Sequence, residues 1–303
     1  MTTGDADASG TQLTASVHWL TGVASGTVWP FLDLAVALTD GGEVEVLGPR
    51  NFYRSHHHVA GIIRVLSDPI HPDTMPDVCV DVAGKSCEWL GWDRLGCLVA
   101  ALDALTRVDV PIDHVGFTPV QVRDADYAGN IRTRGKKSHF REGLRGRTGD
   151  TYTLGTAASS RQLVVYDERG FTRAELRLRD ERAEDMRDVL LGPSEGLLAA
   201  TVGRLSGYVE FVDAVGESNV SRAPALAWWA EFVGMVERVV MPPVVRVAAA
   251  VEGKVAWLVT MAPMLAALVA GGLDLPMILG EGMSRWKARH RAVTHQMTVV
   301  PLT

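Results

Sequence analysis

The chain has 303 residues, of which 47% are hydrophobic and 22% charged, and it carries a formal net charge of −6 at pH 7. A chain of this length can bury a sizeable core as one large domain or as two. The acidic balance argues against a protein that coats DNA regardless of sequence, because such binding depends on neutralising phosphates, but it allows a local basic surface.

The first fourteen residues are small and polar, which predicts a disordered tail. They lack the basic start and the apolar run of a secretory signal. The three cysteines, Cys79, Cys87 and Cys97, show no metal-site spacing and indicate reduced packing residues. Together these features predict a cytoplasmic protein.

Short strands and helices are expected to alternate over the first hundred residues. The pattern predicts a strand over 17–23, a helix over 30–38 with Pro30 in its first turn, and extended segments over 44–47 and 59–66. A core helix is predicted over 92–105, because apolar residues recur there at helical spacing: Leu95, Leu98, Val99, Leu102 and Leu105.

Three consecutive histidines, His56, His57 and His58, raise the question of a metal site. In a strand, neighbouring side chains point to opposite faces, so only His56 and His58 could bind the same ion. We therefore do not predict a metal site at these residues.

Two aspartates lie in an extended segment over 107–113. Arg107, Asp109 and Asp113 share one face of a strand, where a rise of roughly 3.3 Å per residue separates the two aspartates by about 13 Å. One metal ion could bind both only if the strand bends, and Pro111 is where a bend would fall. The alternatives are a salt bridge with Arg107 for Asp109 and a turn-closing role for Asp113.

The densest basic stretch covers residues 123–147, which hold eight arginine or lysine residues and three acidic ones. Lys136, Lys137 and Arg141 lie near its centre. This stretch is either a solvated, disordered loop or a loop that lies on DNA.

Three short strands are predicted over 151–155, 162–167 and 172–179. In the third strand Arg173, Glu175, Arg177 and Arg179 point one way and apolar residues point the other way. Such a polar face can simply be solvated. The alternative is a site in which arginines bind phosphate, a carboxylate holds a metal ion and the phenol of Tyr166 attacks phosphorus.

The rest of the chain is predicted to be mainly helical. We expect helices over 182–191 and 195–205, a strand over 209–215, and a helical region from residue 221 onward that buries Trp228, Trp229 and Phe232. Residues 255–273 are uncharged and long enough to span a bilayer, which leaves a membrane protein as an alternative. Because Pro263 interrupts this segment, we favour a buried, kinked helix and expect no stable membrane insertion.

The segments over 107–113 and 150–183 resemble the replication initiation factor family (Rep_trans), which comprises rolling-circle replication initiators and related relaxases of plasmids, phages and integrative elements. The matching residues are Arg107, Asp109, Asp113, Thr151, Gly155, Ser159, Arg161, Tyr166, Asp167, Gly170, Arg173, Glu175, Leu176, Arg179 and Ala183. The chain departs from the family pattern at Ala157 and Val164, where arginine is usual, and at His18, where aspartate usually precedes Trp-Leu.

The resemblance implies an α+β fold in which two related antiparallel-sheet halves form one body with C-terminal helices. It divides the chain into a disordered tail over 1–14, a catalytic DNA-nicking domain over 15–220 with a basic loop over 123–147, and a helical region over 221–303. It implies DNA as the partner, and it allows a homodimer and a helicase or polymerase of the host as further partners.

The resemblance also implies an activity, which is sequence-specific nicking and strand transfer through a covalent link between Tyr166 and a 5′-phosphate. Arg173 and Arg179 would hold the phosphate, and Asp109 and Glu175 would hold Mg²⁺ or Mn²⁺, with Asp113 as the alternate ligand. The residues expected to contact DNA are Lys136, Lys137, Arg141 and Arg161. The alternative is a catalytically inactive DNA-binding or regulatory protein of the same fold.

Overall fold

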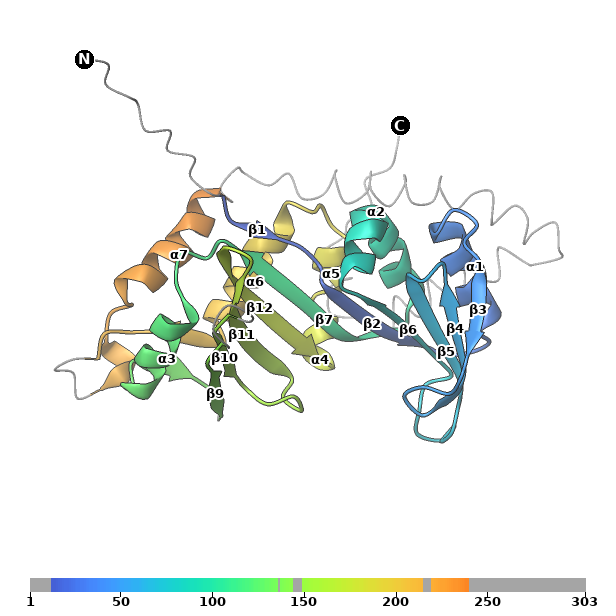
Figure 1. Cartoon of the computed structure of the whole chain (residues 1–303), viewed down its shortest axis with the longest axis horizontal. Coiled ribbons are helices and arrows are strands. Elements are labelled where there is room, and N and C mark those ends of the chain that lie inside the picture. Colours follow the sequence, from blue (N-terminus) through green and yellow to red (C-terminus); the bar gives the residue numbers. More distant parts are fainter. Residues whose placement is uncertain (1–11, 136, 144–148, 215–218, 240–303) are drawn as a thin grey trace, which may run out of the picture. The chain divides into compact units, whose positions relative to one another are not determined.

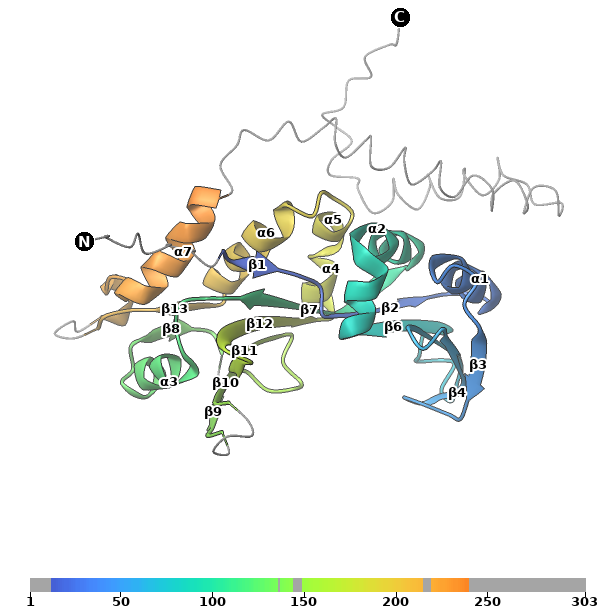
Figure 2. The same cartoon turned by 45° about the horizontal axis from the view of Figure 1, so that its top comes forward.

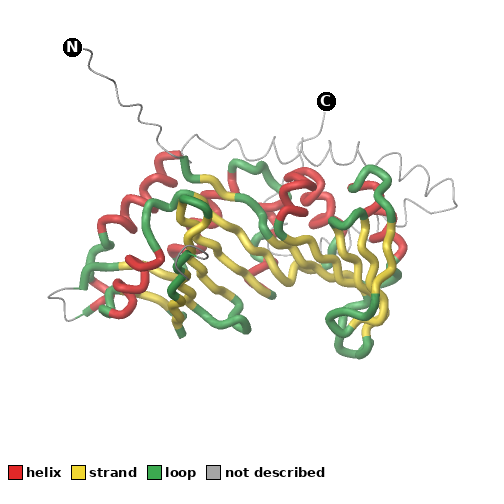
Figure 3. Tube along the Cα trace, viewed as in Figure 1, coloured by secondary structure: helices red, strands yellow, loops and turns green. Residues whose placement is uncertain are grey.

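The centre of the protein is one large antiparallel sheet, shown in Figure 1. This computed structural model describes residues 12–135, 137–143, 149–214 and 219–239. All of them belong to one compact unit, Met1–Arg246. The predicted α+β class is confirmed, since strands form this sheet and helices lie beside it (Figure 3).

The elements of the N-terminal part are, in chain order, β1 (Thr14–Ala15), β2 (Trp19–Ala24), α1 (Trp29–Leu38), β3 (Val44–Leu47), β4 (Tyr53–Val59), β5 (Ile63–Pro69), β6 (Val78–Ala83) and α2 (Lys85–Ala101). The next part contains β7 (Ala104–Asp113), α3 (Pro119–Tyr127), β8 (Ile131–Thr133), β9 (Ser138–Arg141), β10 (Thr151–Leu154), β11 (Arg161–Glu168) and β12 (Phe171–Arg179). The described chain ends with α4 (Glu181–Glu184), α5 (Arg187–Leu190), α6 (Gly196–Ser206), β13 (Val209–Phe211), the 3-10 helix η1 (Val220–Arg222) and α7 (Ala227–Val239).

The strand order of the large sheet is β3-β4-β5-β6-β2-β7-β12-β11-β10-β9, and β1 pairs with β7. The same order is followed on both sides of the central β2–β7 pair. On each side the first strand in the chain pairs with the last, β2 with β6 and β7 with β12, and the remaining strands continue outward to the edges β3 and β9. Antiparallel pairing of β2 with β7 joins the two sides.

Helices cover the apolar face of the sheet. Figure 2 shows α2, α5 and α6 on the same side of the central strands, and α4 contacts β7 and β12. Val108, Val110 and Leu176 point to this side and are at most 1% exposed. Because side chains alternate along a strand, Asp109 and Glu175 belong to the opposite, polar face.

A second cluster of the core is aromatic. Trp229 and Phe232 of α7 are at most 2% exposed and pack against Phe117 and Phe211, with ring centroids 5.1–6.1 Å apart. The prediction that these residues belong to the core is therefore confirmed. This packing attaches α7 to the body of the described unit.

Several element boundaries differ from the prediction, each for a local reason. The segment predicted as extended over 59–66 is interrupted by a turn between β4, which ends at Val59, and β5, which begins at Ile63, because Ala60 and Gly61 have φ values of 52° and 68° and reverse the chain. The helix predicted over 92–105 is wrong at both ends: α2 is Lys85–Ala101, and Leu105 belongs to β7. Leu102 and Leu105 are buried in the helix end and the following strand, so their spacing fits either element.

The stretch over 123–147 is not one loop, which corrects that prediction. Thr118 caps α3 through a capping box with Gln121, so the helix extends through Tyr127, and β8 and β9 follow within the stretch. The expected helix over 182–191 is two short helices, α4 and α5, and the expected strand over 209–215 is only β13.

The segment over 255–273 and Lys136 lie outside the described residues. Among the helices of the described ranges, none combines the length and apolar character needed to cross a membrane.

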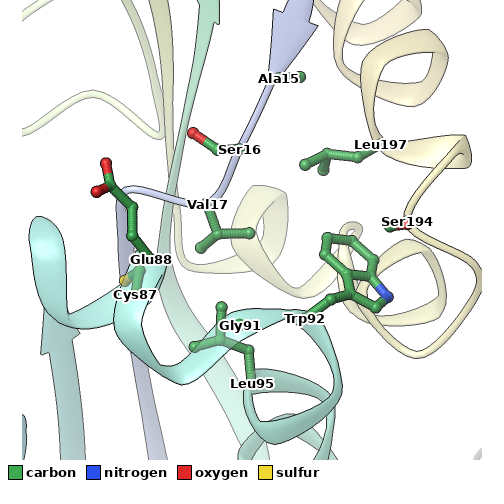
Figure 4. Close-up of a pocket in the computed structure, with 10 residues that line it drawn as sticks. All are labelled: Ala15, Ser16, Val17, Cys87, Glu88, Gly91, Trp92, Leu95, Ser194 and Leu197. Carbon is green, nitrogen blue, oxygen red and sulfur yellow. The ribbon is translucent and has the colours of Figure 1, made fainter.

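A small cavity of about 170 Å³ lies between α2, the segment between β1 and β2, and α6 (Figure 4). Its lining includes the apolar residues Val17, Trp92, Leu95 and Leu197, drawn in Figure 4. The indole Nε1 of Trp92 donates a hydrogen bond to the carbonyl oxygen of Gly192 over 2.8 Å. We interpret this space as a packing gap between the helices and assign no chemistry to it.

Candidate functional site

The polar face of the sheet carries a row of side chains across five strands. Arg141 of β9 is opposite Thr151, which is opposite Tyr166 of β11, and Tyr166 is opposite Arg173 of β12. Arg173 is in turn opposite Asp113 of β7. Side chains of directly opposite residues leave the same face of an antiparallel sheet. The register therefore places Tyr166 between an arginine at the sheet edge and an arginine on the inner strand.

Glu175 lies directly beside the tyrosine. The Tyr166 hydroxyl donates a hydrogen bond to Glu175 Oε2 over 3.1 Å. The same oxygen is 3.4 Å from Nδ1 of His18, which immediately precedes β2. Glu175 is only 2% exposed, so both contacts form in a largely water-excluded environment. Tyr166, Glu175 and His18 thus come from three separate segments and meet at one carboxylate oxygen.

Arg177 lies between the two predicted metal-binding carboxylates. Its Nε is 2.5 Å from Glu175 Oε1 and 3.8 Å from Asp109 Oδ2, so these two oxygens are no further apart than the sum of those distances. Asp109 is 2% exposed and also accepts hydrogen bonds from Arg107, whose Nε is 3.0 Å from Oδ1. Burial holds the pKa of Asp109 above its usual value, although the Arg107 hydrogen bonds oppose this shift.

Asp113 lies on the same face of β7 but pairs with a different arginine from the one between these carboxylates. It binds Arg173 through two hydrogen bonds, of 2.5 and 2.9 Å. This pairing fixes the Arg173 guanidinium beside Tyr166, its opposite residue on β11. Asp113 therefore positions an arginine in the structure described.

Arg179 lies further along the same face of β12. Its Nη1 atom is buried and has no hydrogen-bond partner within the part of the chain that the structure describes. Burial, followed by the charge of the opposite residue Arg107, lowers the pKa of Arg179. A buried guanidinium nitrogen without a partner is a donor available to an anion.

The electrostatics of the cluster keep the tyrosine protonated and the glutamate charged. Burial and then the charge of Glu175 raise the pKa of the Tyr166 phenol to about 12, against an opposing effect of Arg173. Burial would also raise the pKa of Glu175, but the hydrogen bond from His18 and the charge of Arg177 outweigh it and lower that pKa to about 2. The hydrogen bond to Glu175 raises the pKa of His18.

His18 was not among the predicted site residues. The backbone brings it here, because its N–H donates to the Asp109 carbonyl oxygen over 2.9 Å and thereby continues the β2–β7 pairing. The sequence feature that could have identified it is its position directly before Trp19-Leu20, where the pattern of the family that this chain resembles has an aspartate.

The donor chemistry of the cluster suits a divalent cation. Two buried carboxylates supply hard oxygen donors, and His18 adds a nitrogen donor beside them. In the residues described, no three His, Cys, Asp or Glu side chains converge as an ion would require. Arg177 supplies the positive charge between Glu175 and Asp109 instead. The donor types therefore suit an ion, whereas in the arrangement described Arg177 takes the place between the carboxylates.

The predicted DNA contacts fall on different faces. Arg141 is exposed at the edge of the sheet, in the row that contains Tyr166. Arg161 is five positions from Tyr166 in the continuous strand β11 and so leaves the opposite face. Lys137 immediately precedes β9, and its carbonyl oxygen accepts a hydrogen bond from the Gly155 N–H over 2.7 Å. These three residues therefore do not form one patch around the tyrosine.

Two other tyrosines, Tyr152 and Tyr127, lie away from this site. Tyr152 is fully buried, and its opposite residue on β11 is Val165, so it points away from the face of Tyr166. Burial raises the pKa of Tyr152 strongly. Tyr127 ends α3 and is 69% exposed. Within the part of the chain that the structure describes, Tyr166 is thus the tyrosine that lies among the arginines and carboxylates.

Comparisons with known proteins identify a family and a shared fold. A family model described as replication initiation factor (Rep_trans) matches residues 104–271, which is more than half of the chain. The solved structure of a rolling circle replication initiator protein from Geobacillus stearothermophilus is similar, with a TM-score of 0.60 and 20% sequence identity over 75% of this chain and 97% of that chain. At that identity the similarity shows a shared fold. A comparison with curated proteins finds no match.

Proposed function

The chain belongs to the replication initiation factor family, and from this premise we propose that it is a rolling-circle replication initiator or relaxase that nicks DNA through Tyr166. The observation that carries the proposal is the hydrogen bond between Tyr166 and Glu175, on a sheet face lined by arginines. The substrate class is a DNA strand with a specific site, either a replication origin or a transfer origin.

In the proposed reaction the Tyr166 oxygen attacks the phosphorus of one phosphodiester. A bond forms between the phenol oxygen and phosphorus, and the bond from phosphorus to the 3′ oxygen breaks. The phenol proton leaves along the hydrogen bond to Glu175 Oε2 and ends on water, because a carboxylate with a pKa of about 2 does not keep it, and the 3′ oxygen takes a proton from water. The product is a 5′-phosphotyrosyl link and a free 3′-hydroxyl, from which a polymerase can extend.

The arginines of the face would bind the reacting phosphate. Arg173 is held beside Tyr166 by Asp113, so its guanidinium is already oriented before DNA binds. Arg179 offers a buried nitrogen without a partner in the described residues. Donors that are oriented in advance stabilise the charge that develops on phosphate oxygens in the transition state. Arg141, at the sheet edge, would contact the strand on the far side of Tyr166.

Asp109 and Glu175, with His18 beside them, would hold Mg²⁺ or Mn²⁺ in place of the Arg177 guanidinium. Such an ion would polarise the phosphate and favour the charged phenol oxygen. The pKa of about 12 shows why this help matters, since the buried phenol beside Glu175 is a poor nucleophile near neutral pH.

We also propose that the two sides of the sheet are related halves of one body, followed by C-terminal helices. The support is the strand order, which runs outward in the same way from β2 and from β7. Helix α1 follows β2 and helix α3 follows β7, so the correspondence includes the first helix of each half. In this arrangement the tyrosine and both carboxylates come from the second half, and His18 comes from the first.

A second candidate function is DNA binding without nicking by a protein of the same fold. The observation that favours it is Arg177, which occupies the space between Glu175 and Asp109. Val164 adds to this, because it is the residue opposite Glu175 and replaces an arginine of the family pattern.

The proposed function is tested by trapping the covalent product. Single-stranded oligonucleotides that tile the DNA around the coding sequence are incubated with protein and Mn²⁺, and adducts are mapped by peptide mass spectrometry. We expect an adduct on Tyr166 that disappears in Tyr166→Phe and persists in Tyr127→Phe, the exposed control. An adduct that survives Tyr166→Phe would refute the assignment, whereas sequence-specific binding without any adduct would favour the second candidate.

A further inference from the structure

A basic cavity of about 480 Å³ lies at the end of the β10–β11 hairpin. The cavity is separate from the tyrosine cluster, because the side chain of Arg161, which lines the cavity, and the side chain of Tyr166 leave opposite faces of β11. Their separation of five positions corresponds to roughly 16 Å along the strand. The cavity therefore belongs to a surface that the reaction at Tyr166 does not use directly.

The lining of the cavity is positively charged. Its cations are Arg134, Lys137 and Arg161, and none of the described residues that line it is an aspartate or a glutamate. Within the described part of the chain, no ion pair of these three residues with an acidic side chain is present. The Arg161 guanidinium instead lies over the ring of Tyr208, 5.0 Å from its centroid. Three cations without acidic partners attract an anion from the solvent.

Hydroxyl groups complete a donor set on one wall. The turn after β10 is closed by a hydrogen bond from the Ser159 N–H to the Thr156 carbonyl oxygen, of 2.9 Å, and by one from the Thr156 N–H to Ser159 Oγ, of 3.0 Å. The two side-chain hydroxyls lie 3.0 Å apart. The turn thus places two hydroxyls in the lining of a cavity that Arg161 also lines, and hydroxyl and guanidinium donors suit phosphate oxygens.

Two glycines of the lining let the backbone approach the Tyr208 hydroxyl closely. A Cβ on Gly155 would lie 2.7 Å from the Arg161 carbonyl oxygen and 2.8 Å from the Tyr208 hydroxyl, and the φ of 92° at Gly155 also favours glycine. A Cβ on Gly135 would lie 2.9 Å from the same hydroxyl. A side chain at either position would therefore collide with the Tyr208 hydroxyl, which is part of the lining, so the shape of the cavity depends on glycine at both positions.

We propose that this cavity binds a phosphate group of the DNA strand, away from the phosphate that Tyr166 attacks. This inference rests on the proposed function, since it takes DNA as the ligand. The bound phosphate would anchor the strand on one face of the sheet while the tyrosine acts on the other. The same chemistry would also accept a free nucleotide or inorganic phosphate, and the experiment separates these sources.

The test compares two lengths of oligonucleotide. A short single strand that covers only the nick site and one extended by several nucleotides on each side are bound to wild type and to the variant Arg134→Ala/Lys137→Ala/Arg161→Gln, with fluorescence anisotropy as the readout. We expect the variant to bind the extended strand at least about tenfold more weakly. The slope of its log Kd against log salt should fall by about 0.7 for each phosphate that the variant no longer neutralises. Arg54→Ala, which removes an exposed arginine paired with Asp68, is the charge control for each single substitution of the set.

The outcomes distinguish this inference from the proposed function. Tyr166→Phe should lose the covalent adduct but still bind the extended strand more tightly than the short one, and the triple variant should still form the covalent adduct on the short strand. Equal Kd and salt slope for wild type and triple variant would overturn the inference. It would also be overturned if ATP or inorganic phosphate bound tightly enough at micromolar concentration to displace the extended strand, since the cavity would then serve free anions. The single variants Arg134→Ala and Lys137→Ala, both at exposed positions, provide the same comparison if the triple variant unfolds.

Discussion

Arg177→Gln should lower the free energy of unfolding when no metal ion is added, and it should increase the affinity of the protein for Mn²⁺. The guanidinium lies between Glu175 and Asp109 at 2.5 and 3.8 Å, and Glu175 is 2% exposed. Glu175 keeps its contacts with His18 and Tyr166, so the variant loses one charge-assisted hydrogen bond. Such a bond is worth about 1.5–3 kcal/mol, and we expect a loss of about 2 kcal/mol in the free energy of unfolding measured with urea in EDTA.

The same change frees the space between the carboxylates. An ion that binds only the folded protein adds about 2.7 kcal/mol of stability at a concentration one hundred times its Kd. Mn²⁺ should therefore restore the stability of Arg177→Gln and bind it more tightly than wild type, as measured by calorimetry and electron paramagnetic resonance. Arg54→Gln, an exposed pair with Asp68, is the control and should change neither quantity measurably. Equal Mn²⁺ affinity for Arg177→Gln and wild type would refute the idea that arginine and ion compete for one place.

Three further predictions concern other groups. In EDTA, His18→Ala should lower the free energy of unfolding, measured with urea, more at pH 5.5 than at pH 8.5. The contact with Glu175 raises the pKa of His18, so the stability that His18 contributes is present below the usual histidine pKa and is lost as the pH rises through the raised value. Equal losses at the two pH values would contradict the pairing. Arg141→Ala should weaken binding of all DNA sequences about equally and flatten the salt slope by roughly 0.7–0.9 in anisotropy titrations, whereas a change confined to one sequence would indicate base contact. Burial raises the pKa of Cys79 and Cys87 to about 12, so both thiols should react slowly with Ellman's reagent at pH 8 until urea is added, and rapid reaction in the native protein would show that they are accessible.

The strands around the tyrosine were predictable from local patterns. The alternation of polar and apolar residues over 172–179 places Glu175 and Arg173 on one face, and β12 has those residues on one face. The segment over 107–113 was likewise predicted as a strand and forms part of β7. Local periodicity was a good guide here because each strand has one face under the helices and one polar face.

Long-range contacts could not be predicted in the same way. His18 reaches Glu175 from 157 positions away in the chain, because β2 pairs with β7 at the centre of the sheet. No periodicity contains that information. The local pattern failed where one spacing of apolar residues fitted both a helix and a strand. Leu102 and Leu105 are an example, because they are buried whether they continue a helix or enter a strand.

The pairing of the charged groups depends on register, and register determines how the site can work. Alternation shows that Glu175 and Arg177 share a face with Asp109, but a slip of two residues would keep that face and exchange every partner. In the observed register Arg177 is opposite Asp109, and Pro111 is opposite Glu175. Because proline offers no charged partner, Glu175 turns to Arg177, His18 and Tyr166 instead. The contact between the tyrosine and the buried carboxylate, on which the proposed chemistry depends, therefore follows from which residue of β7 lies opposite which residue of β12.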